Sequence, residues 1–196
     1  MSNQSYPSES HEPERPARLW AVNRREFLEM TGAGLLIVAT APSSQAQRGG
    51  GGGPLETRLH IAEDGWVTIL TGKIEEGQGA RTELAMAAAE ELRVPLDRVR
   101  MLMGDTDQAP NDGTTAGSTT TPRTLPLVRR AAAAARQLLL AAASRQFQVD
   151  RARLEVRGGA VTYAGKTYTY AELARSPELA AAYKDALPAG TQVQNS

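Results

Sequence analysis

The chain has no cysteine and only two histidines, His11 and His60, among its 196 residues. Without cysteine it forms no disulfide bond, offers no thiol nucleophile, and holds neither a Cys-based zinc site nor an iron–sulfur centre on its own thiolates. Two histidines also argue against a His-rich metal site. We interpret His60 as a strand residue and His11 as part of a polar tail, and we assign neither to catalysis.

The chain also lacks an excess of charge of either sign, because 22 basic side chains balance 22 acidic ones. A neutral chain has no long-range positive field for nucleic acid or an anionic membrane, so we expect no nucleic-acid partner. The Asp-x-Asp-x-Asp-Gly spacing of a calcium loop is not reproduced by the candidate acids, which are Glu75, Glu76, Asp105, Asp107 and Asp112. We therefore assign no metal ligand.

Residues 1–46 are predicted to form a disordered N-terminus and an export signal. The first 19 residues are polar, contain three prolines and show no apolar periodicity. Arg24 and Arg25 then precede the apolar run Gly32–Ala41 and small residues that end at Ala46, which is the layout of a signal with cleavage after Ala46. The apolar run, about ten residues long, is too short for a hydrocarbon core of roughly 30 Å, which disfavours a permanent transmembrane anchor.

The arginine pair followed by Phe27 and Leu28 is typical of a twin-arginine signal, although Asn23 stands where Ser or Thr is more usual. Such a signal implies a periplasmic protein that crosses the inner membrane folded, with its cofactor inserted first. Association with the inner membrane is compatible with this route. The alternative is an amphipathic helix that begins near Asn23 and carries the arginines as solvated charges.

Beyond the signal, residues 47–54 are predicted to be a Gly-rich linker, residues 55–182 a domain, and residues 183–196 an unstructured tail. We expect an α+β fold, in which β-hairpins and two main amphipathic helices pack on a small sheet. In the first helix, Glu83, Glu90 and Glu91 lie off the apolar stripe. The expected strands are 57–61, 66–71, 98–103, 154–157, 161–163 and 166–168, and the expected helices are 81–92 and 125–147, with a short helical stretch after Tyr170.

Two polar segments are candidates for ligand binding. Gly77 and Gly79 flank Gln78 directly before the first helix, so the backbone is open to a ligand, and the Gln78 amide lies near a helix N-terminus that attracts anions. Residues 104–121 form a long loop of small and polar residues ahead of the second helix. Its candidate hydroxyls are those of Thr115, Ser118 and Thr120. Each pattern is common on its own, and together they suit a polar organic ligand that carries phosphate.

The motifs of this chain, in the order in which they occur, resemble those of the molybdopterin-binding large subunit of the molybdenum hydroxylases, the xanthine dehydrogenase and aldehyde oxidase family. The resemblance covers Leu55 to Arg175. With an export signal before it, the chain is similar to the periplasmic branch that includes the isoquinoline 1-oxidoreductase β subunit. The four matching motifs lie in residues 67–82, 88–100, 104–110 and 113–120.

The resemblance implies a molybdopterin cofactor with molybdenum, in bacteria usually the cytosine dinucleotide form. In this family the cofactor hydroxylates an N-heterocycle or an aldehyde with oxygen from water. The cofactor-binding residues that the resemblance implies are Gly77, Gln78 and Gly79 for the pterin or its phosphate, and Thr115, Ser118 and Thr120 for hydroxyl and amide contacts.

The resemblance assigns no catalytic residue to this chain. The glutamate base of the family lies in a glycine-containing motif near the far end of a much longer chain, and neither Glu172 nor Glu178 has glycine neighbours. The implied partners are the remainder of the large subunit, a small [2Fe–2S] subunit and a cytochrome c as a candidate electron acceptor. The chain is therefore interpreted as the N-terminal part of such a large subunit, and it is not expected to turn over substrate alone. Two alternatives stay open: a stand-alone exported module that binds a ligand without catalysis, and an inactive truncated remnant.

Replacing both Arg24 and Arg25 by Lys tests the export prediction. We expect the double variant to stay in the cytoplasm, because the twin-arginine route requires the arginine pair. Cell fractionation followed by immunoblotting measures the distribution, and Arg18→Lys in the polar leader is the matched control. Unchanged periplasmic delivery of the double variant would refute the assignment.

Overall fold

The computed structural model describes residues 35–39 and 56–184, and the fold is α+β, as the sequence predicts. The strands are β1 (Leu35–Ala39), β2 (Glu56–Ile61), β3 (Val67–Thr71), β4 (Val99–Met103), β5 (Glu155–Arg157), β6 (Ala160–Tyr163) and β7 (Lys166–Thr169). The helices are α2 (Ala80–Leu92), α3 (Leu125–Phe147), α4 (Tyr170–Ala174) and α5 (Pro177–Lys184), with short helical turns η3 (Leu96–Arg98), η4 (Thr120–Thr124) and η5 (Arg151–Arg153).

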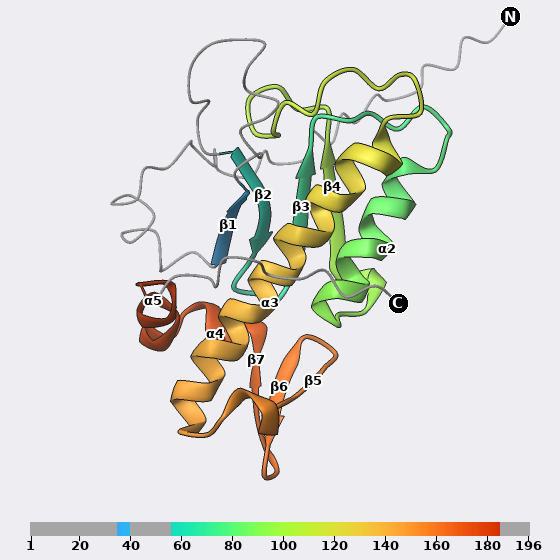
Figure 1. Ribbon diagram of the computed structural model, residues 1–196. Coiled ribbons are helices and arrows are strands. Elements are labelled where there is room, and N and C mark those ends of the chain that lie inside the picture. Colours follow the sequence, from blue (N-terminus) through green and yellow to red (C-terminus); the bar gives the residue numbers. More distant parts are fainter. Residues whose placement is uncertain (1–34, 40–55, 185–196) are drawn as a thin grey trace, which may run out of the picture.

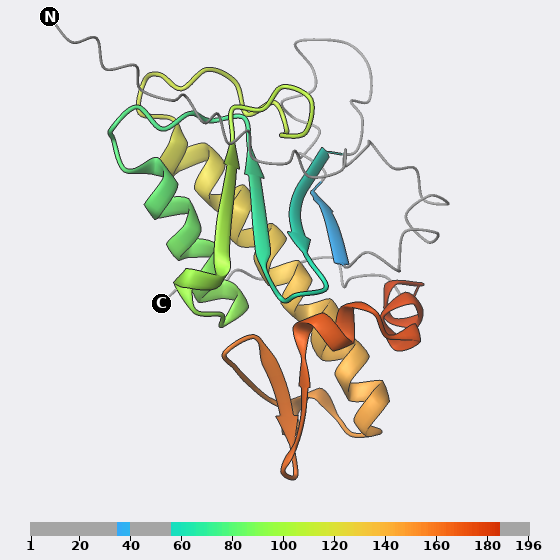
Figure 2. The same cartoon turned by 180° about the vertical axis from the view of Figure 1, so that it is seen from behind.

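These elements form two sheets joined by the long helix α3. The larger sheet has the order β1-β2-β3-β4 and carries α2 and α3 on one face (Figures 1 and 2). The smaller sheet, β5-β6-β7, is an antiparallel meander beside the last turns of α3. Both main helices lie where apolar periodicity predicts them, and α5 extends to Lys184, past the expected domain end at Ala182. None of the helices that the structure describes combines the length and apolar character needed to cross a membrane.

Most of the predicted leader lies outside the described residues. The arginine pair and the cleavage position after Ala46 lie there. The predicted linker 47–54 and residues 185–196 of the predicted tail also lie outside the described residues. Within the apolar run, Leu35–Ala39 forms β1 and pairs antiparallel with β2, with Ile37 opposite Leu59. Cleavage after Ala46 would separate β1 from the sheet, and the export signal itself stays a prediction.

A β-α-β unit places the two candidate ligand-binding segments at one edge of the larger sheet. Strands β3 and β4 run parallel, with Val67 opposite Val99 and Thr71 opposite Met103, and α2 makes the connection between them. The carboxyl ends of parallel strands meet at the same edge, where ligands bind in many α/β proteins. Residues 72–79 follow β3 and residues 104–119 follow β4, and Gly104 N donates a hydrogen bond to Thr71 O at 3.0 Å.

The core lies between the larger sheet and the two main helices. Leu84, Ala88 and Leu92 of the predicted α2 stripe are fully buried, and so are Ala132 and Ala135 of α3. Because alanine has a short side chain, the two helices approach each other closely over this interface. The sheet contributes the buried side chains of Leu59, Ile61, Val67 and Ile69.

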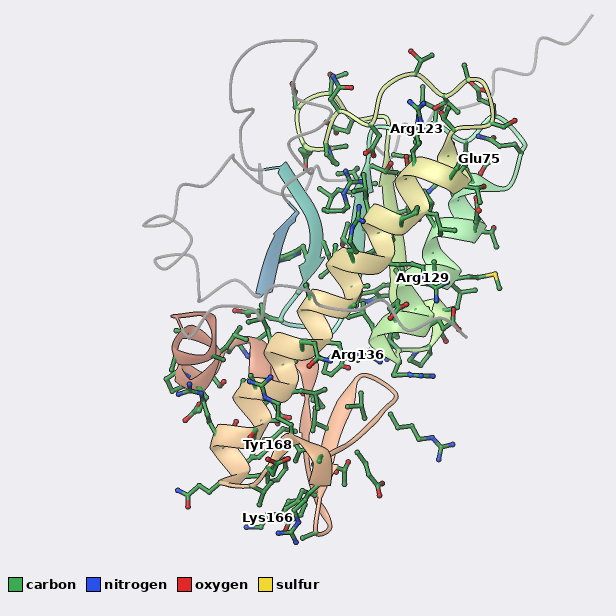
Figure 3. All side chains as sticks on the ribbon, in the orientation of Figure 1. Glu75, Arg123, Arg129, Arg136, Lys166 and Tyr168 are labelled. Carbon is green, nitrogen blue, oxygen red and sulfur yellow. The ribbon has the colours of Figure 1, made fainter. Side chains whose placement is uncertain are left out.

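Glu91 corrects one prediction, because the apolar pattern leaves this carboxylate off the apolar stripe and the structure buries it. Its side chain accepts a hydrogen bond from Arg129 Nε at 3.0 Å and lies 3.9 Å from Arg136 NH2. Both arginines project from α3 near the α2 interface (Figure 3). A buried charge is tolerated when an opposite charge pairs with it. The periodicity of one helix does not reveal a partner that another helix supplies.

Tyr170, the first residue of α4, ties the smaller sheet to the end of α2. Its hydroxyl donates to Leu92 O at 2.7 Å, and its backbone N–H donates to Gly159 O at 2.8 Å. Gly159 N in turn donates to Arg93 O at 3.1 Å. Burial raises the pKa of the Tyr170 phenol far above its usual value, so the hydroxyl stays a donor.

We expect Tyr170→Phe to lower the free energy of unfolding by about 1–3 kcal/mol, because it leaves a buried carbonyl without its donor. Urea denaturation measures the change. Tyr168→Phe is the matched control, because the Tyr168 ring packs against Phe147 and would do so without the hydroxyl. Equal stability of Tyr170→Phe and the wild type would show that the bond contributes nothing.

Candidate functional site

Four of the six predicted ligand-binding residues line one cleft. The cleft has a volume of about 410 Å³ and lies between the residues that precede α2 and the loop that precedes η4. Gln78 lines it from the first segment, and Thr115, Ser118 and Thr120 line it from the second. Gly77 and Gly79 flank Gln78 without belonging to the lining. Segments about forty positions apart therefore converge, because β3 and β4 are adjacent and parallel.

The N-terminus of α2 is capped by a side chain of the protein itself. Glu75 Oε1 accepts from Gly77 N at 2.9 Å and from Gly79 N at 3.0 Å, and Oε2 accepts from Arg81 N at 2.7 Å. These backbone bonds, led by that of Arg81, hold the pKa of Glu75 below its usual value. The predicted anion-attracting helix end is thus occupied by Glu75, which sequence reasoning missed. An acidic residue shortly before a helix is the signal that could have identified it.

Gln78 is held inside its own loop but keeps bonding capacity. Its Oε1 accepts from Glu76 N at 2.6 Å, and its Nε2 donates to Ile74 O at 3.0 Å. A carboxamide has two N–H donors, so one remains for a ligand. Gly77 and Gly79 have φ values of 92° and 81°, and a Cβ at either position would meet nothing within 4 Å. Glycine is needed there for the left-handed backbone of this turn rather than for close packing.

The second wall of the cleft carries hydroxyl groups. Thr115 Oγ1 accepts from Ile74 N at 2.8 Å, which links the two walls and leaves the O–H free to donate. Ser118 is exposed and left-handed, with φ 54°, and its hydroxyl makes no hydrogen bond to the residues that the structure describes. Thr120 is largely buried at the start of η4. A strained non-glycine backbone is frequent where a loop holds a ligand.

A buried ion pair fixes the loop after β4 to the sheet. Asp112 accepts two hydrogen bonds from Arg58, at 2.7 Å and 3.0 Å, and further bonds from Thr71 Oγ1 and Gly72 N. The side chains of Arg58 and Asp112 are 5% and 3% exposed. Burial by itself raises the pKa of Asp112. The hydrogen bonds and positive charge of Arg58, together with the hydrogen bonds from Thr71 and Gly72, outweigh burial and lower this pKa.

Gly72 lets this loop approach the end of β3. A Cβ at this position would clash with the carbonyl oxygen of Pro110 and would lie 3.0 Å from the backbone nitrogen of Asp112. Because both contacts are to backbone atoms, no side-chain movement relieves them. The position therefore excludes every residue with a side chain unless the loop shifts.

Lys73 is the second buried anchor of the same loop. Its side chain is 2% exposed, and Nζ donates to Thr114 O at 2.7 Å, Thr119 Oγ1 at 3.3 Å and Gly113 O at 3.4 Å. Sequence reasoning missed this residue, because a lysine in a polar segment is expected at the surface.

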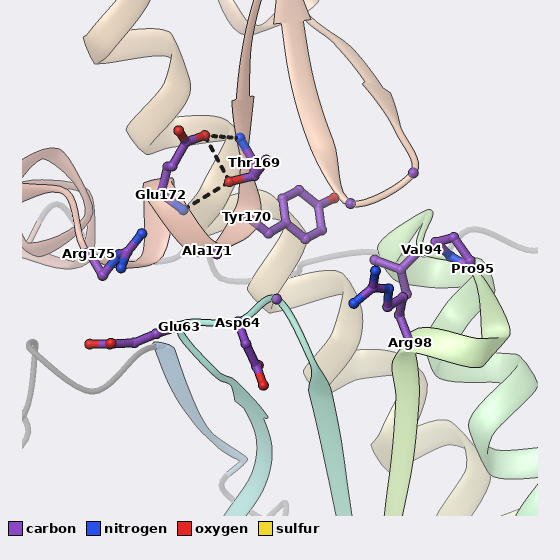
Figure 4. A pocket seen from close by; sticks show the side chains of 13 residues that line it. Glu63, Asp64, Val94, Pro95, Arg98, Thr169, Tyr170, Ala171, Glu172 and Arg175 are labelled. Carbon is purple, nitrogen blue, oxygen red and sulfur yellow. Dashed lines mark hydrogen bonds between the residues drawn. The ribbon is translucent and has the colours of Figure 1, made fainter.

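A second cleft, of about 430 Å³, lies at the opposite edge of the sheet, between the β2–β3 turn and α4 (Figure 4). None of the six predicted residues lines it. Three carboxylates line it, those of Glu63, Asp64 and Glu172. Glu172 accepts from Thr169 N at 2.7 Å and from the Thr169 hydroxyl at 2.8 Å, and these bonds lower the Glu172 pKa. Glu172 therefore serves as a helix cap. Among residues 56–184, no cluster of three or more His, Asp or Glu side chains could hold a metal ion.

Comparisons with known proteins agree on one family. A family profile described as a molybdopterin cofactor-binding domain matches residues 8–194. One of the subunits of nicotinate dehydrogenase from Pseudomonas putida is 33% identical over 158 residues, which are 77% of this chain and 13% of that protein. The beta subunit of isoquinoline 1-oxidoreductase from Brevundimonas diminuta is 34% identical over 130 residues, which are 62% of this chain and 17% of that protein.

Solved structures give the same result. The reconstituted CO dehydrogenase of Oligotropha carboxidovorans matches with a TM-score of 0.54 and 27% identity, over 71% of this chain and 18% of that one. Quinoline 2-oxidoreductase of Pseudomonas putida matches with a TM-score of 0.50 and 26% identity, over 69% and 17%. The chain thus spans less than a fifth of the length of these relatives.

We expect Asp112→Asn to lower the free energy of unfolding at pH 7 by about 3 kcal/mol, because Arg58 would keep a buried charge without its carboxylate. The folded-state pKa of Asp112 lies below its usual 3.8. The contribution of the ion pair is therefore complete above that value, and it is lost as the pH falls from there toward the folded-state pKa.

Urea denaturation of the wild type and the variant between pH 3 and pH 7 measures this contribution. The stability difference should be largest at pH 7 and should shrink below about pH 4. Asp107→Asn, at an exposed position of the same loop, is the matched control and should change stability little. A difference that stays constant with pH would contradict the account.

Proposed function

The chain belongs to the family of molybdopterin cofactor-binding domains of the molybdenum hydroxylases, and from that premise we propose that it holds a molybdopterin cofactor with molybdenum in the cleft between residues 74–79 and 114–121. The observation that carries this proposal is the convergence of Gln78, Thr115 and Ser118 on one cleft. The segment between Gln78 and Ser118 forms α2, β4 and the loop that Asp112 and Lys73 anchor. Gln78 and Ser118 therefore reach the same cleft only in the folded chain.

The bonding capacity left in the cleft fits such a ligand. The free donors are the second N–H of Gln78, the O–H of Thr115 and the O–H of Ser118. Phosphate oxygens and a pterin carbonyl are acceptors, so they match these donors. Because Glu75 occupies the end of α2, the ligand is held by side chains and loop amides rather than by a helix terminus.

We propose that the whole enzyme is an oxidoreductase that hydroxylates an N-heterocycle or an aldehyde. When bound, the cofactor supplies the redox chemistry and the metal centre, and this chain supplies binding and orientation. We propose the cytosine dinucleotide form of the cofactor. The relatives named for nicotinate, isoquinoline and quinoline support a heterocyclic substrate.

The proposed partners are the rest of the large subunit, a small [2Fe–2S] subunit and a cytochrome c acceptor. Two relatives are themselves named as subunits, which supports an assembly of several chains. Because these 196 residues contain no cysteine, the cysteine ligands of any iron–sulfur centre lie outside them. We propose delivery to the periplasm by the twin-arginine route, on the basis of Arg24 and Arg25.

Replacing Gln78 and Ser118 together by Ala tests the cleft. The chain is co-expressed with the rest of a large subunit in a host that makes the cofactor, and molybdenum per protein is measured by mass spectrometry. We expect at least a tenfold loss of molybdenum in the double variant, because each hydrogen bond to a charged group contributes about 1.5–3 kcal/mol.

Thr106→Ala combined with Gln108→Ala is the matched control, on the same long loop but outside the lining of the cleft. It should keep the molybdenum content of the wild type. Full occupancy in the Gln78 and Ser118 double variant would show that the cofactor is bound elsewhere.

A further inference from the structure

Lys73 is a buried cation whose partners are all neutral. Its three acceptors are the carbonyls of Gly113 and Thr114 and the hydroxyl of Thr119. Among the residues that the structure describes, no carboxylate forms an ion pair with Lys73. A buried charge is costly unless an opposite charge compensates it.

The ammonium group lies one hydrogen bond behind the hydroxyl wall of the cleft. Thr119 lines the cleft, and its Oγ1 accepts from Lys73 and donates to Ala116 O at 3.0 Å. Ala116 also lines the cleft. The positive charge is therefore next to the wall that carries Thr115 and Ser118, and it is shielded from solvent by the loop that it holds.

The opposite wall of the cleft has the opposite charge. Glu76 and Glu83 line the cleft from the α2 side. An anionic group of a ligand would be repelled by that wall and attracted to the wall in front of Lys73. The arrangement thus gives the cleft one side for an anion and one side for hydrogen-bond donors of the ligand.

We propose that Lys73 is a positioning residue of the cleft, which shapes the 113–119 loop and supplies the charge that a phosphate group of the ligand neutralises. This inference rests on the proposed function, because it assigns the phosphate of the cofactor to the wall that carries Thr115 and Ser118. A charge buried close to a bound phosphate acts with little screening by solvent.

The absence of cysteine permits a direct test of the charge. In Lys73→Cys, the new thiol is alkylated in the unfolded chain with 2-bromoethylamine, which restores a lysine-like ammonium, or with iodoacetamide, which adds a neutral group. After refolding, the affinity for inorganic pyrophosphate is measured by isothermal titration calorimetry, and circular dichroism checks the fold. Lys166→Cys, at an exposed position of β7, is treated in the same two ways as the matched control.

We expect the aminoethylated protein to bind pyrophosphate like the wild type and the carbamidomethylated protein to bind at least about tenfold more weakly. Both treated forms of the Lys166→Cys variant should bind like the wild type. Equal affinities of the two treated forms of Lys73→Cys, or no binding of pyrophosphate by the wild type, would overturn the proposal.

A second variant covers the case in which the neutral form does not fold. Thr119→Val removes the hydroxyl between Lys73 and the cleft and leaves both carbonyl acceptors in place. It should weaken pyrophosphate binding, and unchanged binding would overturn the proposal.

Molybdenum content separates this proposal from the proposed function. We expect Lys73→Gln to lose molybdenum in the co-expressed subunit. If Lys73→Gln kept a normal molybdenum content while the Gln78 and Ser118 double variant lost molybdenum, the role of Lys73 would be refuted and the proposed function would stand. A wild type without molybdenum would refute the proposed function itself.

Discussion

The buried ion pair between Arg58 and Asp112 is the constraint on which the cleft end of this molecule depends. Arg58 belongs to β2, which is antiparallel to β3, so the start of β2 lies at the edge where β3 ends. Asp112 belongs to the long loop after β4, and it also accepts from Thr71 and Gly72 at the end of β3. One carboxylate thus joins two strands and a loop that would otherwise be costly to order. Together with Lys73, which holds residues 113–119, this anchor fixes the loop that carries the hydroxyls of the cleft.

The charges at this edge are arranged differently from those of a phosphate-binding loop. In such loops the free N–H groups of a helix end hold the anion. Here Glu75 accepts from the N–H groups of Gly79 and Arg81 at the helix end, and the positive charge lies behind the opposite wall, on Lys73. Hydroxyl groups in front of a buried cation would make the cleft selective for a ligand that carries both an anionic group and a ring with hydrogen-bonding atoms at its edge. The second cleft differs, because it carries the carboxylates of Glu63, Asp64 and Glu172, and Glu172 is used in the capping box of α4.

Much of this architecture could be predicted from the sequence, and the remainder depends on contacts between distant residues. Apolar periodicity was sufficient for α2 and α3, because their buried faces repeat along one helix. Gln78, Thr115 and Ser118 were selected through the family resemblance. The structure brings them to one cleft, and their role in binding stays a prediction. Parallel pairing of β3 with β4 is not encoded in either strand alone, and the burial of Glu91 requires arginines that lie about forty positions away.

Hydrogen–deuterium exchange of the assembled subunit, with and without its molybdopterin cofactor, tests the central claim most directly. If the cofactor lies between residues 74–79 and 114–121, amide exchange in both segments should slow when it is bound. Exchange around the second cleft, in residues 169–175, should stay the same. Slower exchange confined to residues 169–175, or no change in either segment of the proposed cleft, would contradict the account.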